Sequence, residues 1–353
     1  MHQNDVALNA LLQDMEAADP IYQPTHFWRA AIGSLVEELR GEGLERFRAL
    51  PGPLDFFVPS YSFPGYHSSP RRFAPVHLAL DGLQLTDARV GAHMDRLFSG
   101  EAHAESDYRA LLASDTPCPL FIDHFSESRV GDPIEQFEFD GRRFSRSSLN
   151  YLLGLSFLKR HCDLSQVATV MEIGGGFGSL GEILLADPRN DVFYIDVDIA
   201  PTLLCANYYL NEIYGEDAIV GYSETRGRSV LDIAQMRKMH RAATLASWQL
   251  PVLNGKVDLV VNFISFQEME PAVVRNYLAQ ADRLGSQFVL LRNLREGKAK
   301  AAASTDVGVV DPIKGEMYDD YLQGYRLLAC NTVPFGYRTV DGFHSELRLY
   351  ERR

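Results

Sequence analysis

The sequence predicts an α/β fold, in which a mainly parallel β-sheet is flanked by helices. Two observations lead to this prediction. Beyond about residue 140, short apolar runs of strand length alternate with segments of helical periodicity. The first of these runs leads directly into a glycine-rich turn and then a helix, within residues 170–185. A strand, a tight turn and a helix in this order form the repeating unit of doubly wound sheets.

The glycine-rich turn carries the strongest functional signal in the chain. Four glycines follow the first apolar run: Gly174, Gly175, Gly176 and Gly178. They let the backbone turn sharply and approach a ligand closely, because no Cβ intervenes. Leu180, Ile183 and Leu184 then recur at helical spacing, so the helix begins with its free N–H groups facing whatever the turn holds. The stretch therefore predicts a loop that binds a nucleotide cofactor.

Two glycine frames fit this turn. Gly176, Gly178 and Gly181 match the G-x-G-x-x-G frame of dinucleotide-binding proteins. In the second frame, Glu-x-Gly-x-Gly-x-Gly, Glu172 ends the strand, and this frame resembles motif I of the class I S-adenosylmethionine-dependent methyltransferases. A carboxylate there suits the ammonium of a methionyl group, whereas the pyrophosphate of NAD needs backbone donors and no negative charge. The acid therefore favours the second frame.

The next predicted strand, residues 191–198, ends in two carboxylates, Asp196 and Asp198. An acid at this place can accept both hydroxyls of a ribose, in NAD sites and S-adenosylmethionine sites alike. Asp198-Ile-Ala-Pro resembles the acid-x-x-Pro segment of the methyltransferase family, so Asp198 is the first choice for the ribose and Asp196 the second. The alternative for Asp196 is a cap of the helix that begins near Thr202.

Residues 242–251 and 256–262 predict two further strands, which resemble the adenine-holding segment and the fourth strand of that family. Many relatives end the third strand with an acid that binds the adenine amino group, but here Ser247 and Trp248 stand in that neighbourhood. Trp248 could stack on the purine, or it could pack in the core beneath the sheet. Asn262, at the end of the fourth strand, completes the candidates for cofactor binding.

Three motifs together make the resemblance specific to one family of methyltransferases. They are Gly-Gly-Gly-Phe-Gly at 174–178, Tyr-Ile-Asp-x-Asp-Ile-x-Pro-Thr-Leu at 194–203 and Asn-x-x-Ser-Phe-Gln-Glu-Met at 262–269. In combination they resemble a bacterial family of sugar O-methyltransferases, which is similar to tailoring enzymes of antibiotics and glycans. The resemblance implies a Rossmann-like sheet of seven strands, S-adenosyl-L-methionine as cofactor, and methyl transfer to a hydroxyl of a sugar or glycosylated small molecule. An N- or C-methyltransferase of a natural-product pathway and a non-catalytic cofactor-binding or assembly protein are the alternatives.

The composition of the chain argues against several classes of binding partner. A formal net charge of −13 argues against a nucleic-acid backbone as substrate, because neutralising phosphates needs a basic face. The four cysteines are scattered without zinc or disulfide spacing, and no apolar stretch reaches membrane-spanning length. We expect a cytoplasmic protein that contacts neither membrane nor nucleic acid and acts on a small molecule, and homo-oligomerisation remains open.

We place a domain boundary near residue 140. Residues 1–140 are expected to form a mainly helical accessory region that caps the substrate, and residues 141–353 the methyltransferase domain, with its last strands at 286–292, 325–333 and 344–351. One helical stripe in the accessory region contains Trp28, Ile32, Leu35 and Leu39. Residues 51–75 are rich in proline and aromatic residues, a composition that favours an ordered loop, and such a loop could wall a substrate pocket. The prolines are at 51, 53, 59, 64, 70 and 75, and the aromatic residues are Phe56, Phe57, Tyr61, Phe63 and Tyr66. A hairpin is expected over residues 136–144, and helices over 86–113 and 145–161.

Transfer to a sugar hydroxyl calls for a base within hydrogen-bond reach. Some O-methyltransferase families place a histidine just after the fourth strand, where this chain has Gln267 with Glu268 beside it. Gln267 cannot take a proton, whereas Glu268 can, and burial would raise its pKa toward a useful range. Glu268 is therefore the leading base, its alternative role being to support the helix that begins near Pro271. His344 and His124 are the reserve candidates. The acidic run over residues 306–320 favours a solvated loop, so no metal site is predicted.

Overall fold

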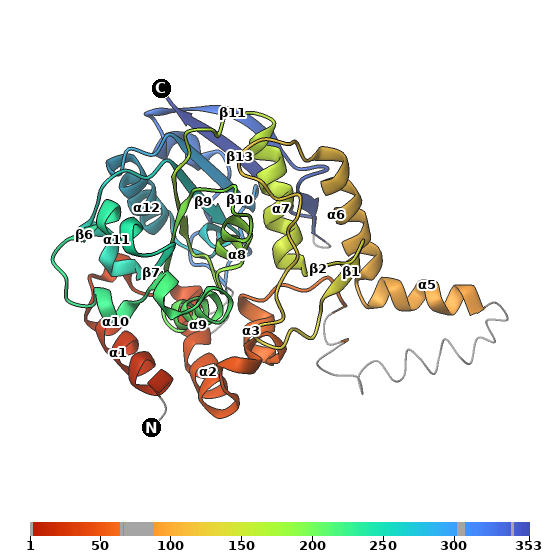
Figure 1. Ribbon diagram of the computed structural model, residues 1–353, viewed down its shortest axis with the longest axis horizontal. Coiled ribbons are helices and arrows are strands. Elements are labelled where there is room, and N and C mark those ends of the chain that lie inside the picture. The colour runs from red at the N-terminus through yellow and green to blue at the C-terminus, as the bar shows by residue number, and fades with distance from the viewer. Residues whose placement is uncertain (1–2, 64–65, 67–87, 302–307, 340–341) are drawn as a thin grey trace.

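A computed structural model describes residues 3–63, 66, 88–301, 308–339 and 342–353 (Figure 1). Its described part contains a nine-stranded sheet in the order β11-β13-β10-β9-β3-β4-β7-β5, with β12 paired to β13. The parallel strands are β3 (Thr169–Ile173), β4 (Phe193–Asp198), β5 (Ile219–Val220), β7 (Ala242–Ala246), β9 (Leu259–Phe263) and β10 (Phe288–Leu294). The antiparallel strands are β11 (Tyr325–Asn331), β12 (Tyr337–Arg338) and β13 (His344–Arg352). The predicted α/β class is confirmed, and the short strands β5 and β12 extend the seven predicted strands.

Helices cover both faces of this sheet. One face carries α7 (Arg146–Lys159), α8 (Ser179–Ala186) and α9 (Thr202–Tyr214), and the other carries α11 (Ile233–Met239), α12 (Pro271–Arg283) and α13 (Met317–Tyr321). Successive residues of β3 divide between the two faces, because side chains alternate along a strand: Val170 joins the first core, and Met171 joins the second. All of β3 is buried, as expected for a central parallel strand. Short elements complete this part: α10 (Tyr222–Thr225), the pair β6 (Leu231–Asp232) and β8 (Leu253–Asn254), and the 3₁₀ turns Glu216–Ala218, Ser247–Val252 and Phe266–Glu268.

The N-terminal region is mainly helical. It contains α1 (Gln3–Ala17), α2 (His26–Glu42), α3 (Pro51–Phe56), α5 (Ala88–Phe98), α6 (Glu101–Ser114), 3₁₀ turns at Pro20–Tyr22 and Leu44–Ala49, and the hairpin of β1 (Phe137–Phe139) and β2 (Arg142–Phe144). Figure 1 shows α1, α2 and α3 along one edge of the sheet domain and α5 projecting from it. In the predicted stripe of α2, Trp28, Leu35 and Leu39 are buried and Ile32 is half-buried. These side chains share one hydrophobic core with α7 and α8, so the boundary near residue 140 remains a prediction.

The predicted helix over residues 86–113 is wrong in one respect. Its described part is two helices, α5 and α6, separated at Ser99 and Gly100. Gly100 adopts a φ of 84°, and a Cβ on it would lie 2.4 Å from the Cβ of Tyr61. The close approach of the chain at Tyr61 therefore requires a glycine in the left-handed conformation, which ends a helix. The expected helix start at Thr86 or Asp87 lies outside the described residues, as do Pro64, Pro70 and Pro75 of the predicted loop.

Two helical glycines should respond oppositely to a methyl group. A Cβ on Gly33, in α2, would meet no atom within 4 Å, whereas a Cβ on Gly181, in α8, would lie 2.6 Å from the ring of Tyr194. We expect Gly33→Ala to raise the free energy of unfolding by up to about 1 kcal/mol through helix propensity. Gly181→Ala should lower it by about 1–3 kcal/mol through overpacking. Urea unfolding of both variants measures the two effects, and equal shifts would contradict the described packing of α8 on β4.

Candidate functional site

A cavity of the described structure opens at the carboxyl ends of β3, β4 and β9. The chain leaves β3 toward β4 on one side and later returns to β9 on the other, so the cavity lies at the switch point where α/β sheets bind ligands. It encloses about 1140 Å³, its open mouth included. Four parts of the chain line it: the glycine turn with the neighbouring strand ends, the first turns of α7, the segment between Glu268 and Tyr277, and segments of the N-terminal region between Gln23 and Pro59.

At Gly174 and Gly175 the turn approaches its neighbours too closely for a side chain. A Cβ on Gly174, where φ is 72°, would lie 2.1 Å from Ser265 Oγ, and a Cβ on Gly175 would lie 2.4 Å from Asp196 Oδ1. The turn is also fixed by hydrogen bonds to β4. Gly174 N–H donates to the carbonyl of Val197 at 2.8 Å, and Gly176 N–H donates to Asp198 Oδ2 at 2.8 Å. Glycine is therefore required here for both conformation and close approach.

Three carboxylates are buried beneath or beside this turn: Glu172, Asp196 and Asp198. Burial raises the pKa of Glu172 to about 7 and that of Asp198 to about 6, and it raises the pKa of Asp196 well above its ordinary value. Tyr194 donates its hydroxyl to Glu172 Oε2 at 2.6 Å. Glu172 Oε1 and both oxygens of Asp196 have no hydrogen-bond partner within the described structure. The turn thus covers a group of acids whose hydrogen-bonding capacity is only partly used.

Of these three acids, only Asp198 lines the cavity. Its two oxygens accept hydrogen bonds from the N–H groups of Gly176 and Ile199, the latter at 2.7 Å. Glu172 lies behind the wall, close to Tyr151, which does line the cavity. Asp196 faces the turn at Gly175 and does not reach the cavity. The geometry therefore places Asp198 at the cavity, Glu172 one side chain behind it, and Asp196 away from it.

The remaining predicted cofactor residues lie outside the lining. Ser247 donates to the carbonyl of Tyr22 at 2.7 Å, and Trp248 packs edge-to-face on Tyr222 with ring centroids 5.7 Å apart. Asn262 donates to the carbonyl of Ile173 at 2.7 Å and thereby joins the ends of β9 and β3. The wall next to Asp198 is formed instead by Ile199, Thr202 and Tyr277. Tyr277 could have been found from the apolar period of α12, where it is buried with Val274, Leu278 and Ala281.

Glu268 lines the cavity, whereas Gln267 does not. Gln267 Oε1 accepts the N–H of Leu294 at 2.8 Å and so braces the end of β10. Glu268 Oε1 accepts from Lys298 Nζ at 2.6 Å. Burial raises the pKa of Glu268, and Lys298 and the indole of Trp28 oppose that rise without cancelling it. No sequence motif marks Lys298, which reaches Glu268 from beyond β10, and its Nζ also lies 3.7 Å from the ring centroid of Phe27.

The two reserve histidines lie away from the cavity lining. His344, at the start of β13, is 2.7 Å from Glu296 Oε1. His124 is exposed and 3.2 Å from Asp123 Oδ2, beside a separate surface depression that includes Arg189. Within the described ranges, no group of three or more His, Cys, Asp or Glu side chains is placed to hold a metal ion. Likewise, no helix there is long and apolar enough to cross a membrane.

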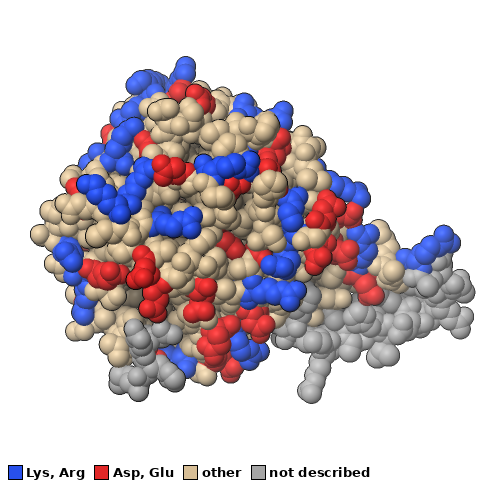
Figure 2. Space-filling model, in the orientation of Figure 1, with Lys and Arg blue, Asp and Glu red and all other residues tan. Residues whose placement is uncertain are grey.

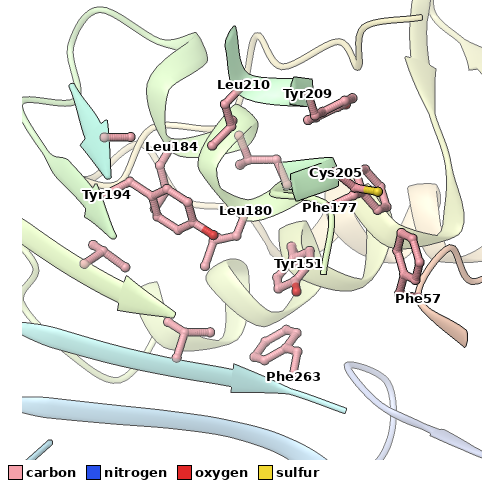
Figure 3. Packing of buried hydrophobic residues seen from close by; sticks show 14 of the residues in the cluster. Phe57, Tyr151, Phe177, Leu180, Leu184, Tyr194, Cys205, Tyr209, Leu210 and Phe263 are labelled. Atoms are coloured by element: carbon pink, nitrogen blue, oxygen red, sulfur yellow. The ribbon is translucent and has the colours of Figure 1, made fainter. Parts of the chain in front are cut away.

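Aromatic side chains enclose the cavity on its accessory side. Trp28, Phe56 and Phe57 line it, whereas Tyr61 donates its hydroxyl to Asp107 at 2.5 Å and lies outside the lining. Tyr66 is also outside it. On the opposite wall, Tyr151 stacks on Phe263 with ring centroids 4.9 Å apart, as Figure 3 shows. Ser147 and Asn150 of α7 add polar groups that sequence reasoning missed, and the amide nitrogen of Asn150 is buried without a partner.

No family model and no curated protein sequence matches the chain. Similar solved structures include the mitomycin 7-O-methyltransferase MmcR, at 15% identity over 59% of this chain and 58% of that chain, with a TM-score of 0.37. The N-terminal domain of EvdMO1 with SAH and D-fucose is similar at 12% identity, over 71% and 97%, with a TM-score of 0.38. The small RNA methyltransferase HEN1 is similar at 16% identity, over 62% and 27%, with a TM-score of 0.38. The chain thus spans less than two thirds of the first and third of these proteins, and such weak likenesses assign neither activity nor substrate.

The buried acids make stability depend on pH. Glu172 holds its proton more tightly in the folded state than in the unfolded state, because its pKa is raised from 4.5 to about 7. Its contribution to the free energy of unfolding is therefore full below pH 4.5 and is lost as the pH rises through about 7. We expect the free energy of unfolding of the unliganded protein to fall between pH 5 and pH 8. In Glu172→Gln this fall should be smaller by about 2–3 kcal/mol, because one titrating group is gone. Urea unfolding at several pH values measures it, and parallel curves for parent and variant would show that Glu172 does not titrate in this range.

Proposed function

We propose that the chain binds S-adenosyl-L-methionine and transfers its methyl group to a hydroxyl of a small-molecule acceptor, a sugar or a glycoside. One observation carries this proposal. A glycine turn at the end of β3 closes over the buried Glu172, and Asp198, at the end of β4, faces the same cavity. This is the placement expected of a site that binds an adenosine through its ribose and tolerates positive charge beside the turn.

The residues present fit that cofactor. A carboxylate offers about four acceptor positions, so Asp198 can accept two ribose hydroxyls besides the N–H groups of Gly176 and Ile199. The unpaired Glu172 Oε1 adds negative potential near the turn. The charged side chains of the described lining are Asp55, Asp198 and Glu268, all of them acidic. Such a lining favours a cationic sulfonium and ammonium, and it disfavours the diphosphate of NAD.

When bound, S-adenosylmethionine supplies a methyl group already activated by its positive sulfur, so the residues of this chain have to orient the acceptor and exclude water. Trp28 and Phe56 of the accessory region line the cavity, and the stacked rings of Tyr151, in α7, and Phe263, at the end of β9, form another wall. Aromatic faces of this kind suit the apolar C–H faces of a sugar ring. Orientation between these walls is therefore the main contribution we assign to the protein.

Glu268 is the group we propose to accept the proton of the reacting hydroxyl. Its carboxylate lines the cavity, and Lys298 fixes one oxygen by a hydrogen bond of 2.6 Å. Thr25 also holds this segment, because its hydroxyl donates to the carbonyl of Glu268 at 2.8 Å. Burial keeps the pKa of Glu268 above its ordinary value, which favours proton uptake. Thr25, from the accessory region, and Lys298, from beyond β10, thus hold the proposed base from two directions.

A small acceptor is supported by charge as well as by enclosure. On the face shown in Figure 2, Lys and Arg side chains are interspersed with Asp and Glu, and no continuous basic surface is visible there. A nucleic-acid backbone would need such a surface. Turnover of labelled cofactor against sugar nucleotides, glycosylated metabolites and amines tests the acceptor, because turnover of amines alone would favour N-methylation.

Asp198 should be required for cofactor affinity. Removing a charged hydrogen-bond acceptor costs about 1.5–3 kcal/mol, so Asp198→Ala should weaken binding of S-adenosylhomocysteine about tenfold to a hundredfold. Asp191→Ala is a matched control, because Asp191 precedes the same strand but is almost fully exposed. Titration calorimetry compares the variants. Binding of NAD without binding of S-adenosylhomocysteine would overturn the proposed cofactor.

Glu268 should affect turnover more than cofactor binding. Glu268→Gln keeps the size of the side chain but cannot accept a proton, so turnover should fall by about 10²- to 10⁴-fold while S-adenosylhomocysteine still binds. Glu270→Gln, two residues away and outside the cavity lining, is the control. An unchanged rate for Glu268→Gln on an acceptor that the parent methylates would show that another group takes the proton.

A further inference from the structure

One large side chain stands in the glycine turn, Phe177, and it is held by residues of the N-terminal region. Phe177 is buried and lines the cavity between Gly176 and Gly178. The guanidinium carbon of Arg48 lies 5.1 Å from its ring centroid. We propose that Arg48 is a positioning residue for the cofactor turn, so that the N-terminal region sets cofactor affinity from behind the site. This inference rests on the proposed function, because it takes the turn to bind S-adenosylmethionine.

Arg48 belongs to an aromatic group that surrounds Phe177. Its guanidinium also lies 5.8 Å from the ring centroid of Tyr209, on α9, and Phe177 and Tyr209 meet edge-to-face at 5.1 Å. The ring centroid of Phe47 lies 5.6 Å from that of Phe177 and 6.3 Å from that of Phe57, which lines the cavity. Figure 3 shows Phe57, Phe177 and Tyr209 within this core. Phe177 is therefore enclosed by side chains from both parts of the molecule.

The orientation of Arg48 is fixed on its other side. It is 1% exposed and forms an ion pair with the buried Glu127, and it donates to the carbonyls of Ser128 and Val130 at 3.4 and 3.3 Å. Glu127 in turn accepts from the hydroxyls of Ser145 and Ser148, at 2.8 and 3.0 Å, at the start of α7. A planar guanidinium can serve an ion pair, two carbonyls and an aromatic face together, which a lysine ammonium cannot.

The guanidinium of Arg48 also acts on a second buried carboxylate, that of Glu182. Glu182, in the first turn of α8 directly after the glycine turn, accepts from Ser128 N–H at 2.7 Å and from the hydroxyl of Tyr209 at 2.5 Å. Burial, followed by the charge of Glu127, raises its pKa to about 7, and Arg48 opposes that rise. One buried cation thus serves a carboxylate of the N-terminal region and another on the helix that carries the turn. Removing its charge would leave two buried acids without a counter-charge.

The consequence for binding follows from the flexibility of the turn. Glycines have many accessible conformations, and the apparent affinity of a site falls with the fraction of molecules in the binding-competent conformation. The contacts around Phe177 are made by side chains of this chain alone, so they favour the competent conformation without any contribution from the cofactor. Loosening them should lower affinity even when the rest of the fold is intact.

The test replaces Arg48 while keeping its charge. Arg48→Lys should bind S-adenosylhomocysteine about three- to thirtyfold more weakly, the range expected for loss of a buried cation–π contact. Amide hydrogen exchange in the unliganded variant should be faster at residues 174–178. Affinity is measured by calorimetry well below the thermal midpoint of each variant, so that partial unfolding does not contribute.

A matched control separates positioning from stability. Lys159 also forms a buried ion pair that joins the two regions, 2.6 Å from Asp115, but neither residue lines the cavity. Lys159→Met should lower the thermal midpoint and leave both affinity and exchange at the turn unchanged. If Arg48→Lys does not fold, Arg48→Met with Glu127→Gln removes the ion pair as a unit and should show the same loss of affinity.

The outcomes distinguish this inference from the proposed function. Unchanged affinity and exchange at the turn in the Arg48 variant, with S-adenosylhomocysteine bound by the parent, would overturn the inference alone. Equal losses of affinity in Arg48→Lys and Lys159→Met would also overturn it, because the effect would then be general destabilisation. A parent protein that binds no S-adenosylhomocysteine would overturn the proposed function, and the inference with it.

Discussion

The structure depends on burying Glu172, Asp196 and Asp198 together at the carboxyl edge of β3 and β4. Desolvation makes this arrangement costly, and it raises the pKa of all three groups. The turn above them must be glycine, because a Cβ at Gly175 would overlap the carboxylate of Asp196. A cationic ligand would offset part of the cost. The same acids that weaken the unliganded fold thus supply the potential that we propose for cofactor binding.

The N-terminal region contributes to both ends of the site. Trp28 and Thr25 contact Glu268, the proposed base, and Arg48 contacts Phe177, in the glycine turn. These contacts are continuous with the core that joins α2 to α7 and α8. Removal of this region would expose that core and take away contacts of the turn and of the proposed base, so we expect the region to be needed for folding as well as for the proposed function.

Local pattern was enough to predict the sheet and the glycine turn, because each depends on residues that are adjacent in the chain. The seven main strands follow from their apolar runs, and Asp198 follows from its place at the end of one of them. Tyr151, Lys298 and Arg48 could not be predicted, since each reaches the site from a distant segment and none belongs to a recognisable motif. The break at Gly100 was missed for a related reason: the chain at Tyr61 approaches it, and only tertiary structure shows this.

The most direct measurement is a crystal structure of the protein grown with S-adenosylhomocysteine. We expect both ribose hydroxyls within hydrogen-bond distance of Asp198, and the homocysteine end over Gly174 and toward Tyr151. We also expect Phe177 to keep its position between Arg48 and the cavity. A ligand bound in another cavity, or one whose ribose does not reach Asp198, would contradict the proposed cofactor site.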